Sequence, residues 1–237
     1  MVDYEKQFDS APYAAGRTAA RVSVFPLVYG WMCGALALSG AVAWYVFSSG
    51  MWKTVFSSSN MYIGCIIAEV VLVLALSAAI RKIPYAAAVA MFAVYAFLNG
   101  LTLSVVCLVY KIETVQQAFF VSAGMFGGLA LYGTFTKADV SGVGSFCGMA
   151  LWGLILASVV NWFVGSNALD WVVCAAGVAI FTGLTMWDAQ KIKRLADASP
   201  EMDAADVRKI ALMGSLELYL DFINLFLYLL RMFGRKR

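Results

Sequence analysis

The sequence predicts an all-α integral membrane protein with seven transmembrane helices. Of its 237 residues, 62% are hydrophobic and only 13% are charged, whereas about 25% of the residues in a soluble domain are charged. The mean hydropathy is +0.81. Five stretches of 17 to 31 residues contain no charged side chain at all. Together these observations exclude an ordinary soluble domain.

The spans follow from the charge-free stretches. A helix needs about 20 apolar residues to cross the hydrocarbon core. The five uncharged stretches each supply one span, and two further apolar stretches are interrupted by acids. We expect spans at residues 25–47, 61–80, 85–109, 114–135, 143–164, 168–188 and 209–230. The connections are short, so the chain divides into a cytoplasmic N-terminal tail (1–24) and one seven-helix transmembrane domain (25–237).

The orientation follows from the lysines and arginines, which favour cytoplasmic segments. With the N-terminus inside, the inner segments carry 11 of these residues and the outer segments carry 6, four of them in the C-terminal tail. This distribution favours a cytoplasmic N-terminus. The basic tail at 235–237 would lie outside after seven spans, or inside if the last segment re-entered the membrane to leave six.

Composition excludes several chemistries. The chain has no histidine, which excludes His-ligated zinc and Ser-His-Asp or Cys-His catalysis. The five cysteines lie in apolar runs without a CxxC pair, so we expect neither disulfides nor a tightly bound cofactor. The basic residues form no single patch, which argues against nucleic-acid binding. We expect no enzymatic activity, because neither membrane aspartate lies in the GxGD motif of an intramembrane aspartyl protease.

Four acids lie at membrane depth or at its edge, namely Glu69, Asp188, Glu217 and Asp221. An ionisable residue inside a span is costly and is a functional hypothesis by default. On the last span the polar residues recur at i, i+4, i+7 and i+11, on one helix face: Glu217, Asp221, Asn224 and Tyr228. Such a face must lie against protein or water. The alternative is a purely structural hydrogen-bond network, or for Asp188 a simple pairing with the bases that follow it.

Asp188 and Asp221 both fall in the inner half of the bilayer and could meet. Two carboxylates about 4 Å apart repel by about 4 kcal/mol at an effective dielectric constant near 20, so such a pair would hold one proton near neutral pH. Deprotonated, it offers the oxygen ligands that calcium prefers. Arg81 could compete for these carboxylates, although it could equally be a positive-inside anchor. Glu69, Glu217 and Asn224 are candidates to line a path.

Two further patterns concern packing. Glycines four residues apart let helix backbones approach in lipid, and they occur in three pairs: Gly30 and Gly34, Gly124 and Gly128, and Gly144 and Gly148. The run Ser199-Pro200-Glu201 predicts a helix start, and this helix would continue into the last span.

Four motifs give a family resemblance. FTGLTMWDAQKIKRL (181–195) and LELYLDFINLFLYLLRMFGRKR (216–237) resemble the C-terminal motifs of the Bax inhibitor-1, or transmembrane Bax-inhibitor-motif, family. YAFLNGLTLS (95–104) and TKADVSGVG (136–144) are similar to its third-span and fourth-loop motifs. The resemblance is to bacterial members, which implies a bacterial inner membrane. It also implies two three-helix layers around a central C-terminal helix.

The resemblance implies a function as well: a pH-sensitive calcium leak channel gated by an aspartate pair, here Asp188 and Asp221, with an arginine near Arg81 engaging the pair. Its partners would be the lipid bilayer, calcium and protons. The alternative is a regulatory protein that binds or modulates a membrane protease, as the FtsH-modulator-like members do, without transport.

Overall fold

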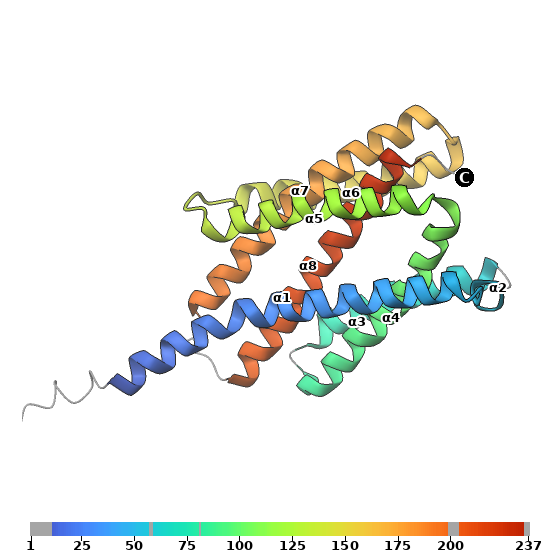
Figure 1. Cartoon of the computed structure of the whole chain (residues 1–237). Coiled ribbons are helices and arrows are strands. Elements are labelled where there is room, and N and C mark those ends of the chain that lie inside the picture. The colour runs from blue at the N-terminus through green and yellow to red at the C-terminus, as the bar shows by residue number, and fades with distance from the viewer. Residues whose placement is uncertain (1–10, 57–58, 81, 199–203, 235–237) are drawn as a thin grey trace, which may run out of the picture.

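The computed structural model describes residues 11–56, 59–80, 82–198 and 204–234. Within these ranges, side chains are described from residue 24 onward, with the exception of residue 59. These residues form helices joined by short connections, and no strand occurs among them (Figure 1). The helices are α1 (Ala11–Ser48), α2 (Trp52–Val55), α3 (Ser59–Ala79), α4 (Tyr85–Val109), α5 (Ile112–Phe135), α6 (Ser141–Val164), α7 (Asn167–Ala198) and α8 (Ala204–Phe233).

Glycine and proline set several helix boundaries. Gly50 follows α1 with φ of 72°, and Gly165 ends α6 with φ of 66°, a left-handed conformation that side chains disfavour and glycine adopts freely. Pro84 precedes the first residue of α4 in an extended conformation, where the missing N–H breaks no helical hydrogen bond. The chain therefore turns sharply at the membrane surfaces and leaves little room for a further domain.

The prediction of seven spans is confirmed, since seven helices are long and apolar enough to cross a membrane. The predicted spans agree with α1 and α3–α8 except at the ends of the last two helices. α7 continues ten residues beyond the predicted end at 188, and the described part of α8 begins at Ala204 rather than 209. The start predicted at Ser199-Pro200-Glu201 lies outside the described residues. α1 already begins at Ala11, inside the expected tail.

α8 is a single helix of 30 residues, about 45 Å long at 1.5 Å per residue. This length exceeds the hydrocarbon thickness of about 30 Å, and the helix does not turn back. The length of α8 agrees with the seven-span prediction.

The helices form two layers on either side of α8. α1 and α3 pack on α4 in one layer, whereas α5 and α6 pack on α7 in the other. α8 contacts members of both layers and crosses between them (Figure 1). In the most apolar window of α8, 67% of the residues are buried, compared with at most 39% in any other span. The C-terminal helix is therefore the centre of the bundle.

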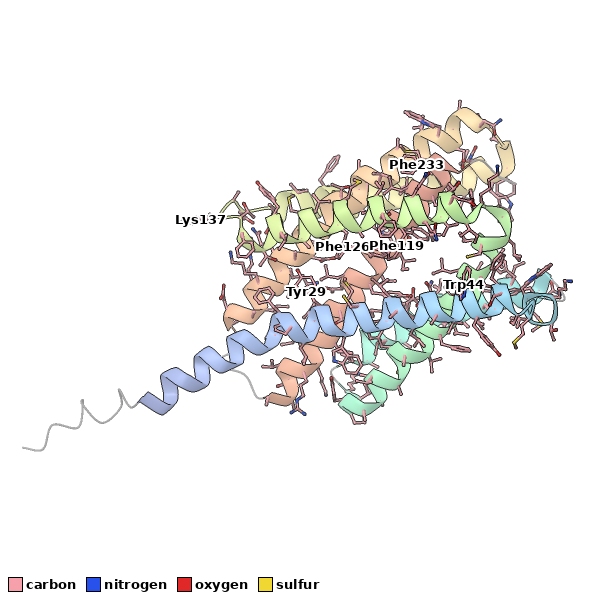
Figure 2. The ribbon with its side chains drawn as sticks, in the orientation of Figure 1. Tyr29, Trp44, Phe119, Phe126, Lys137 and Phe233 are labelled. Atoms are coloured by element: carbon pink, nitrogen blue, oxygen red, sulfur yellow. The ribbon has the colours of Figure 1, made fainter. Side chains whose placement is uncertain are left out.

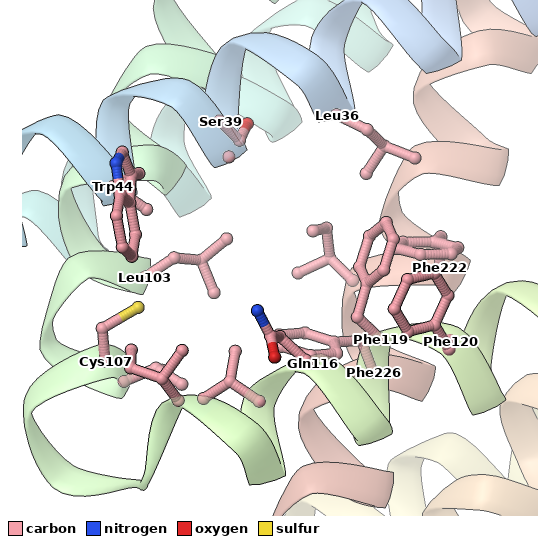
Figure 3. A pocket seen from close by; sticks show the side chains of 16 residues that line it. Leu36, Ser39, Trp44, Leu103, Cys107, Gln116, Phe119, Phe120, Phe222 and Phe226 are labelled. Atoms are coloured by element: carbon pink, nitrogen blue, oxygen red, sulfur yellow. The ribbon is translucent and has the colours of Figure 1, made fainter.

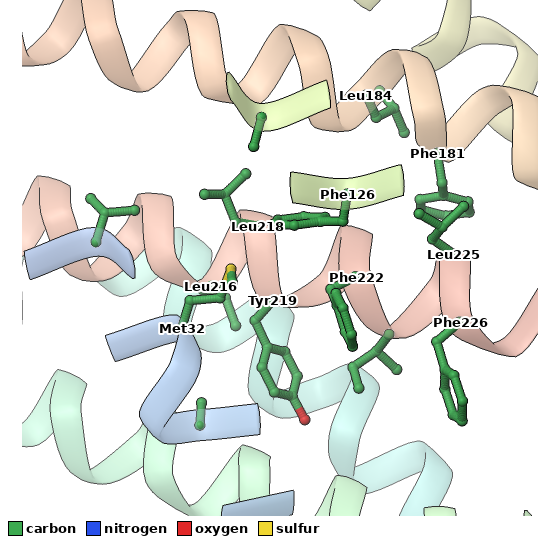
Figure 4. Close-up of a cluster of buried hydrophobic side chains, with 14 of the residues drawn as sticks. Met32, Phe126, Phe181, Leu184, Leu216, Leu218, Tyr219, Phe222, Leu225 and Phe226 are labelled. Carbon is green, nitrogen blue, oxygen red and sulfur yellow. The ribbon is translucent and has the colours of Figure 1, made fainter. Parts of the chain in front are cut away.

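Aromatic side chains form the core around α8 (Figure 4). Phe222 meets Phe126 of α5 edge to face, with ring centroids 5.5 Å apart, and meets Phe119 at 5.6 Å. On the other side, Tyr219 is fully buried and lies edge-on to Phe92 of α4 at 5.8 Å. Such contacts each contribute about 0.5–1.5 kcal/mol beyond area burial, so both layers are anchored to α8.

The predicted glycine pairs are mostly wrong as packing sites. A Cβ added at Gly30, Gly34, Gly124, Gly128 or Gly148 would meet nothing within 4 Å, and of the six only Gly144 makes a close contact, against the Trp187 ring. The close approaches occur elsewhere. A Cβ at Gly133 of α5 would strike the backbone carbonyl of Met186, and one at Gly100 of α4 would lie 2.7 Å from the carbonyl oxygen of Ser39.

The five cysteines are all free. The prediction that they form no disulfide is confirmed. Cys147 and Cys174 are buried between helices, where cysteine behaves as a small apolar side chain.

A buried carboxyl pair and its surroundings

Asp188 of α7 and Asp221 of α8 meet in the interior of the bundle. Their side chains are only 7% and 5% exposed, and the two carboxyl groups lie close enough to interact electrostatically. The Oδ2 atom of Asp221 is buried and has no hydrogen-bond partner. Two ionised carboxylates this close would repel each other, and one shared proton would remove that repulsion. The sequence argument that the two aspartates could meet agrees with this geometry.

The position of Asp188 is set by close packing of the residues just before it. The carbonyl of Met186 fits against Gly133 of α5, and the ring of Trp187 fits against Gly144 of α6. No larger residue would fit at either glycine without moving α7. These two contacts hold α7 in the register that turns Asp188 toward α8.

The bases after Asp188 bind other acids. Lys191 donates to Oε1 of Glu217 at 2.7 Å, and its ammonium lies 5.3 Å from the centre of the Trp187 ring. Arg194 donates to Oδ1 of Asp139 at 2.6 Å. The alternative that Asp188 is simply paired with the following bases is therefore not supported for Lys191 or Arg194. Glu217 is one helical turn from Asp221 and is already neutralised.

The connection between α5 and α6 is fastened to α7 beside the pair. The side chain of Gln190 donates to the Ala138 carbonyl at 2.7 Å and accepts from the Val140 backbone N–H at 3.1 Å. Hydrogen bonds from Ser141 and from Arg194 lower the pKa of Asp139 to about 2. The site is thus closed on one side by a connection with defined partners.

A second polar cluster surrounds Glu69 of α3. Thr102 donates to Oε1 of Glu69 at 2.9 Å, and the Asn99 amide donates to Oε2 at 3.3 Å. Asn99 in turn accepts from the Tyr219 hydroxyl at 2.9 Å, and the oxygen of Tyr219 lies 2.7 Å from Oγ of Ser39. A continuous chain of hydrogen bonds therefore joins α3, α4, α8 and α1.

The remaining predicted residues are placed as follows. Asn224 donates to the carbonyl of Leu220 within α8 at 2.8 Å, so its amide serves the helix backbone rather than the aspartates. Tyr228 stacks on Phe181 of α7, with ring centroids 5.8 Å apart. The polar face of α8 thus does face protein, but it does not form one connected site. Arg81 lies outside the described residues, and its role stays a prediction.

The carboxyl pair offers few protein ligands for a metal ion. Among the residues that the structure describes, no group of three or more Cys, Asp or Glu side chains could hold a metal ion. Two carboxylates supply at most four oxygens, whereas calcium takes six to eight oxygen ligands. Water would have to supply the remainder.

Several functional side chains were not found from the sequence. The sequence shows bases after Asp188 but gives no partner for Lys191 or Arg194, and its local pattern does not identify Gln190, Tyr219, Ser39 or Asn99. A usable indication was present, because Asn99 and Ser39 are polar residues inside otherwise apolar runs. Polar groups in a span need partners.

Comparison with known proteins places the chain among bacterial membrane proteins. A family sequence model described as "Inhibitor of apoptosis-promoting Bax1" matches residues 21–237. The inner membrane protein YbhL of Escherichia coli K12 is 46% identical over 211 residues, covering 89% of this chain and 90% of YbhL. A protein of Borreliella burgdorferi is 39% identical, covering 89% and 90%. One of Rickettsia prowazekii is 36% identical, covering 89% and 88%. The matched region contains all seven spans and both aspartates, and the chain belongs to the Bax inhibitor-1 family of multi-pass membrane proteins.

Proposed function

We propose that the protein is a pH-sensitive calcium leak channel whose gate is the pair Asp188 and Asp221. The observation that carries the proposal is the proximity of two buried carboxyl groups on different helices. Because α7 belongs to one layer and α8 is the central helix, a change of charge in this pair acts directly on the contact between them.

The protonated pair is the closed state in this proposal. One proton allows the two carboxyl groups to remain in contact. When that proton leaves, two negative charges about 4 Å apart repel by about 4 kcal/mol at an effective dielectric constant near 20. Since 1.4 kcal/mol corresponds to a factor of ten in an equilibrium constant, this repulsion can shift a closed-to-open equilibrium by about a thousandfold. Calcium conduction therefore increases as pH rises.

Calcium meets the deprotonated carboxylates as a permeant ion in transit. The free Oδ2 of Asp221 is available without breaking any existing hydrogen bond. Glu217 does not compete, because Lys191 neutralises it at 2.7 Å. Weak binding by few protein ligands suits conduction, which requires that an ion can leave as well as enter. Glu69 is the other acid on the proposed path, and it is held by Thr102 and Asn99.

The membrane is the bacterial inner membrane, with the N-terminus cytoplasmic. The first part of this proposal rests on YbhL, an inner membrane protein of Escherichia coli. The second rests on the excess of Lys and Arg in the segments that would then be cytoplasmic.

A flux assay tests the proposal. The purified full-length protein is reconstituted into liposomes that contain a calcium reporter, and calcium entry is measured on the acid and alkaline sides of neutrality. We expect flux to rise with pH in the wild type, and this pH dependence to be lost in Asp188→Asn and in Asp221→Asn. Asp206→Asn is the matched control, since Asp206 is an exposed acid on α8.

Two outcomes contradict the proposal. One is the absence of calcium flux at every pH from a correctly folded wild-type protein. The other is a pH dependence that is the same in both aspartate variants and in the wild type. A protein that binds a membrane protease but conducts no calcium would instead support the regulatory alternative.

A further inference from the structure

A cavity of about 320 Å³ lies between α1, α4, α5 and α8 (Figure 3). Leu36 and Trp44 of α1 form one wall, Leu103 of α4 closes one end, and Phe119 of α5 lies opposite α1. Phe222 of α8 forms part of the floor. α1 and α5 belong to different layers. The cavity lies between their facing surfaces.

The cavity is too apolar to hold ordered water. Of its lining residues, only Ser39 and Gln116 carry strongly polar side chains. The Ser39 hydroxyl is already in contact with Tyr219 and with the Ala96 carbonyl. A buried water needs two to four polar partners, and apolar cavities stay dry. The occupant must therefore be apolar.

The cavity opens toward the lipid-facing surface of the bundle. Trp44 is 57% exposed and Phe120 is 72% exposed, although both also line the cavity. In Figure 2, Trp44 lies on α1 and Phe119 on α5, and both residues line the cavity. In a bilayer, these exposed rings lie among acyl chains. An empty apolar space beside them would lose dispersion contacts on all its walls.

Positive charge lies at the same end of the bundle as the opening. Lys111 is exposed and directly precedes Ile112, which lines the cavity. Lys53 is exposed in α2, shortly after Trp44 on the chain. Among the described residues, the acids of this end are Glu113 and Asp170. Asp170 is paired with Arg231, so Lys53 and Lys111 outnumber the one remaining acid. A phosphate headgroup at this membrane surface would be attracted to the lysines.

We propose that this cavity is a binding site for one acyl chain of a membrane phospholipid, with its phosphate at the level of Lys53 and Lys111. The chain enters between α1 and α5 and contacts Phe222, the neighbour of Asp221. It thereby packs against the side of α8 that faces the cavity. The proposal rests on the apolar lining of the cavity and on the two lysines at the same end of the bundle. It does not depend on calcium conduction.

Gly40 provides a sharp way to fill the site. Gly40 lines the cavity, and a Cβ added there would meet no atom within 4 Å. A leucine at this position projects into the cavity without a backbone clash. Gly34 is the matched control, because it lies on the same helix, also has open space at its Cβ, and does not line the cavity. Val115→Phe fills the cavity from α5 and replaces Gly40→Leu should that variant fail to fold.

The experiment uses the full chain in vesicles of phosphatidylethanolamine and phosphatidylglycerol that contain phosphatidylglycerol with a photoactivatable diazirine on one acyl chain. After illumination, the labelled peptides are mapped by mass spectrometry. We expect enriched labelling at the cavity residues of α1 and α5 relative to Trp162 and Phe163, which are more than 80% exposed on α6. Gly40→Leu reduces this labelling several-fold, whereas Gly34→Leu leaves it unchanged.

Three results overturn the proposal. The first is labelling of the cavity residues no stronger than that of Trp162 and Phe163. The second is equal labelling of the wild type and the filled variants. The third is protection of the cavity residues from lipid together with chemical crosslinks between two copies through α1 or α5, which would assign the cavity to a second copy of the chain.

Discussion

The hydroxyl of Tyr219 offers a direct test of how the two layers are joined to α8. The side chain is fully buried, donates to Oδ1 of Asn99 at 2.9 Å and lies 2.7 Å from Oγ of Ser39. The Tyr219 proton goes to Asn99. The Ser39 hydroxyl also lies 2.7 Å from the Ala96 carbonyl oxygen, so its single proton is shared between that carbonyl and the oxygen of Tyr219. Tyr219→Phe removes both hydrogen bonds and retains the ring that contacts Phe92 and Tyr95.

The loss of unfolding free energy expected for Tyr219→Phe can be taken from other membrane proteins. Hydrogen bonds between their helices contribute about 0.6 kcal/mol each on average and about 1.7 kcal/mol at most. Two such bonds give a loss of about 1–2 kcal/mol in the free energy of unfolding. Tyr219→Ala should cost more, about 3–5 kcal/mol, because it also leaves a cavity where the ring was.

The measurement is reversible unfolding in mixed micelles titrated with a denaturing detergent. Tyr132→Phe is the control, because Tyr132 is 56% exposed on α5. Ser39→Ala and the double variant complete a double-mutant cycle, in which Ser39 and Tyr219 should show a coupling energy of about 0.6 kcal/mol. If Tyr219→Phe changes stability no more than Tyr132→Phe does, or if the two variants at Ser39 and Tyr219 are additive, the network does not join the helices in the way described.

Two further predictions concern packing and charge near the carboxyl pair. Gly133→Ala should lower the free energy of unfolding by about 1–3 kcal/mol, because its methyl group would strike the Met186 carbonyl, whereas Gly128→Ala, with open space at its Cβ, should be neutral or stabilising in the same titration. Asp139 has a pKa lowered from 3.8 to about 2 in the folded protein, so its contribution to stability is complete above about pH 4 and is lost as pH falls to about 2. The difference in melting temperature between wild type and Asp139→Asn should therefore shrink as pH falls from about 4 to about 2. A difference that persists unchanged at the lower pH would show that the bond to Arg194 does not depend on the charge of Asp139.

The sequence was sufficient for the spans and for the central place of α8. Spans are visible because runs without charge are long enough to cross the bilayer. The last span is different, since Glu217 and Asp221 interrupt its apolar run, and acids at membrane depth must face protein or water. That argument alone indicates a buried helix, and 67% of the residues in its most apolar window are buried.

The hydrogen-bond partners could not be obtained in the same way. Tyr219 and Asp221 are two residues apart, which is about 200° around a helix at 3.6 residues per turn. They therefore face opposite layers, and nothing in the local pattern says which helix each one meets. Lys191 is three residues beyond Asp188, but its ammonium reaches Glu217 of α8 instead. Partner choice depends on how α7 and α8 are aligned, and the close contacts of Gly177 with Tyr228 and of Gly214 with Ile192 lie between these two helices.

The glycine spacing fails for a related reason. Two glycines four residues apart lie on one helix face, but the spacing does not say whether that face meets another helix or lipid. Gly30 and Gly34 have open space above them, whereas Gly100 and Gly133 occur without a glycine partner four residues away and carry close helix contacts.

The central position of α8 has a consequence for how the protein is made. An acid at the centre of a span opposes insertion from the translocon by about 2.5–3.5 kcal/mol, and α8 carries both Glu217 and Asp221. Among the residues that the structure describes, the partners of these acids are on α7. Lys191 pairs with Glu217, and Asp188 lies beside Asp221. α7 must therefore be in the membrane before α8 can pair its acids. The polar side chains therefore constrain the order in which the helices insert. A chain arrested before α8 would leave Asp188 in the membrane without Asp221 beside it.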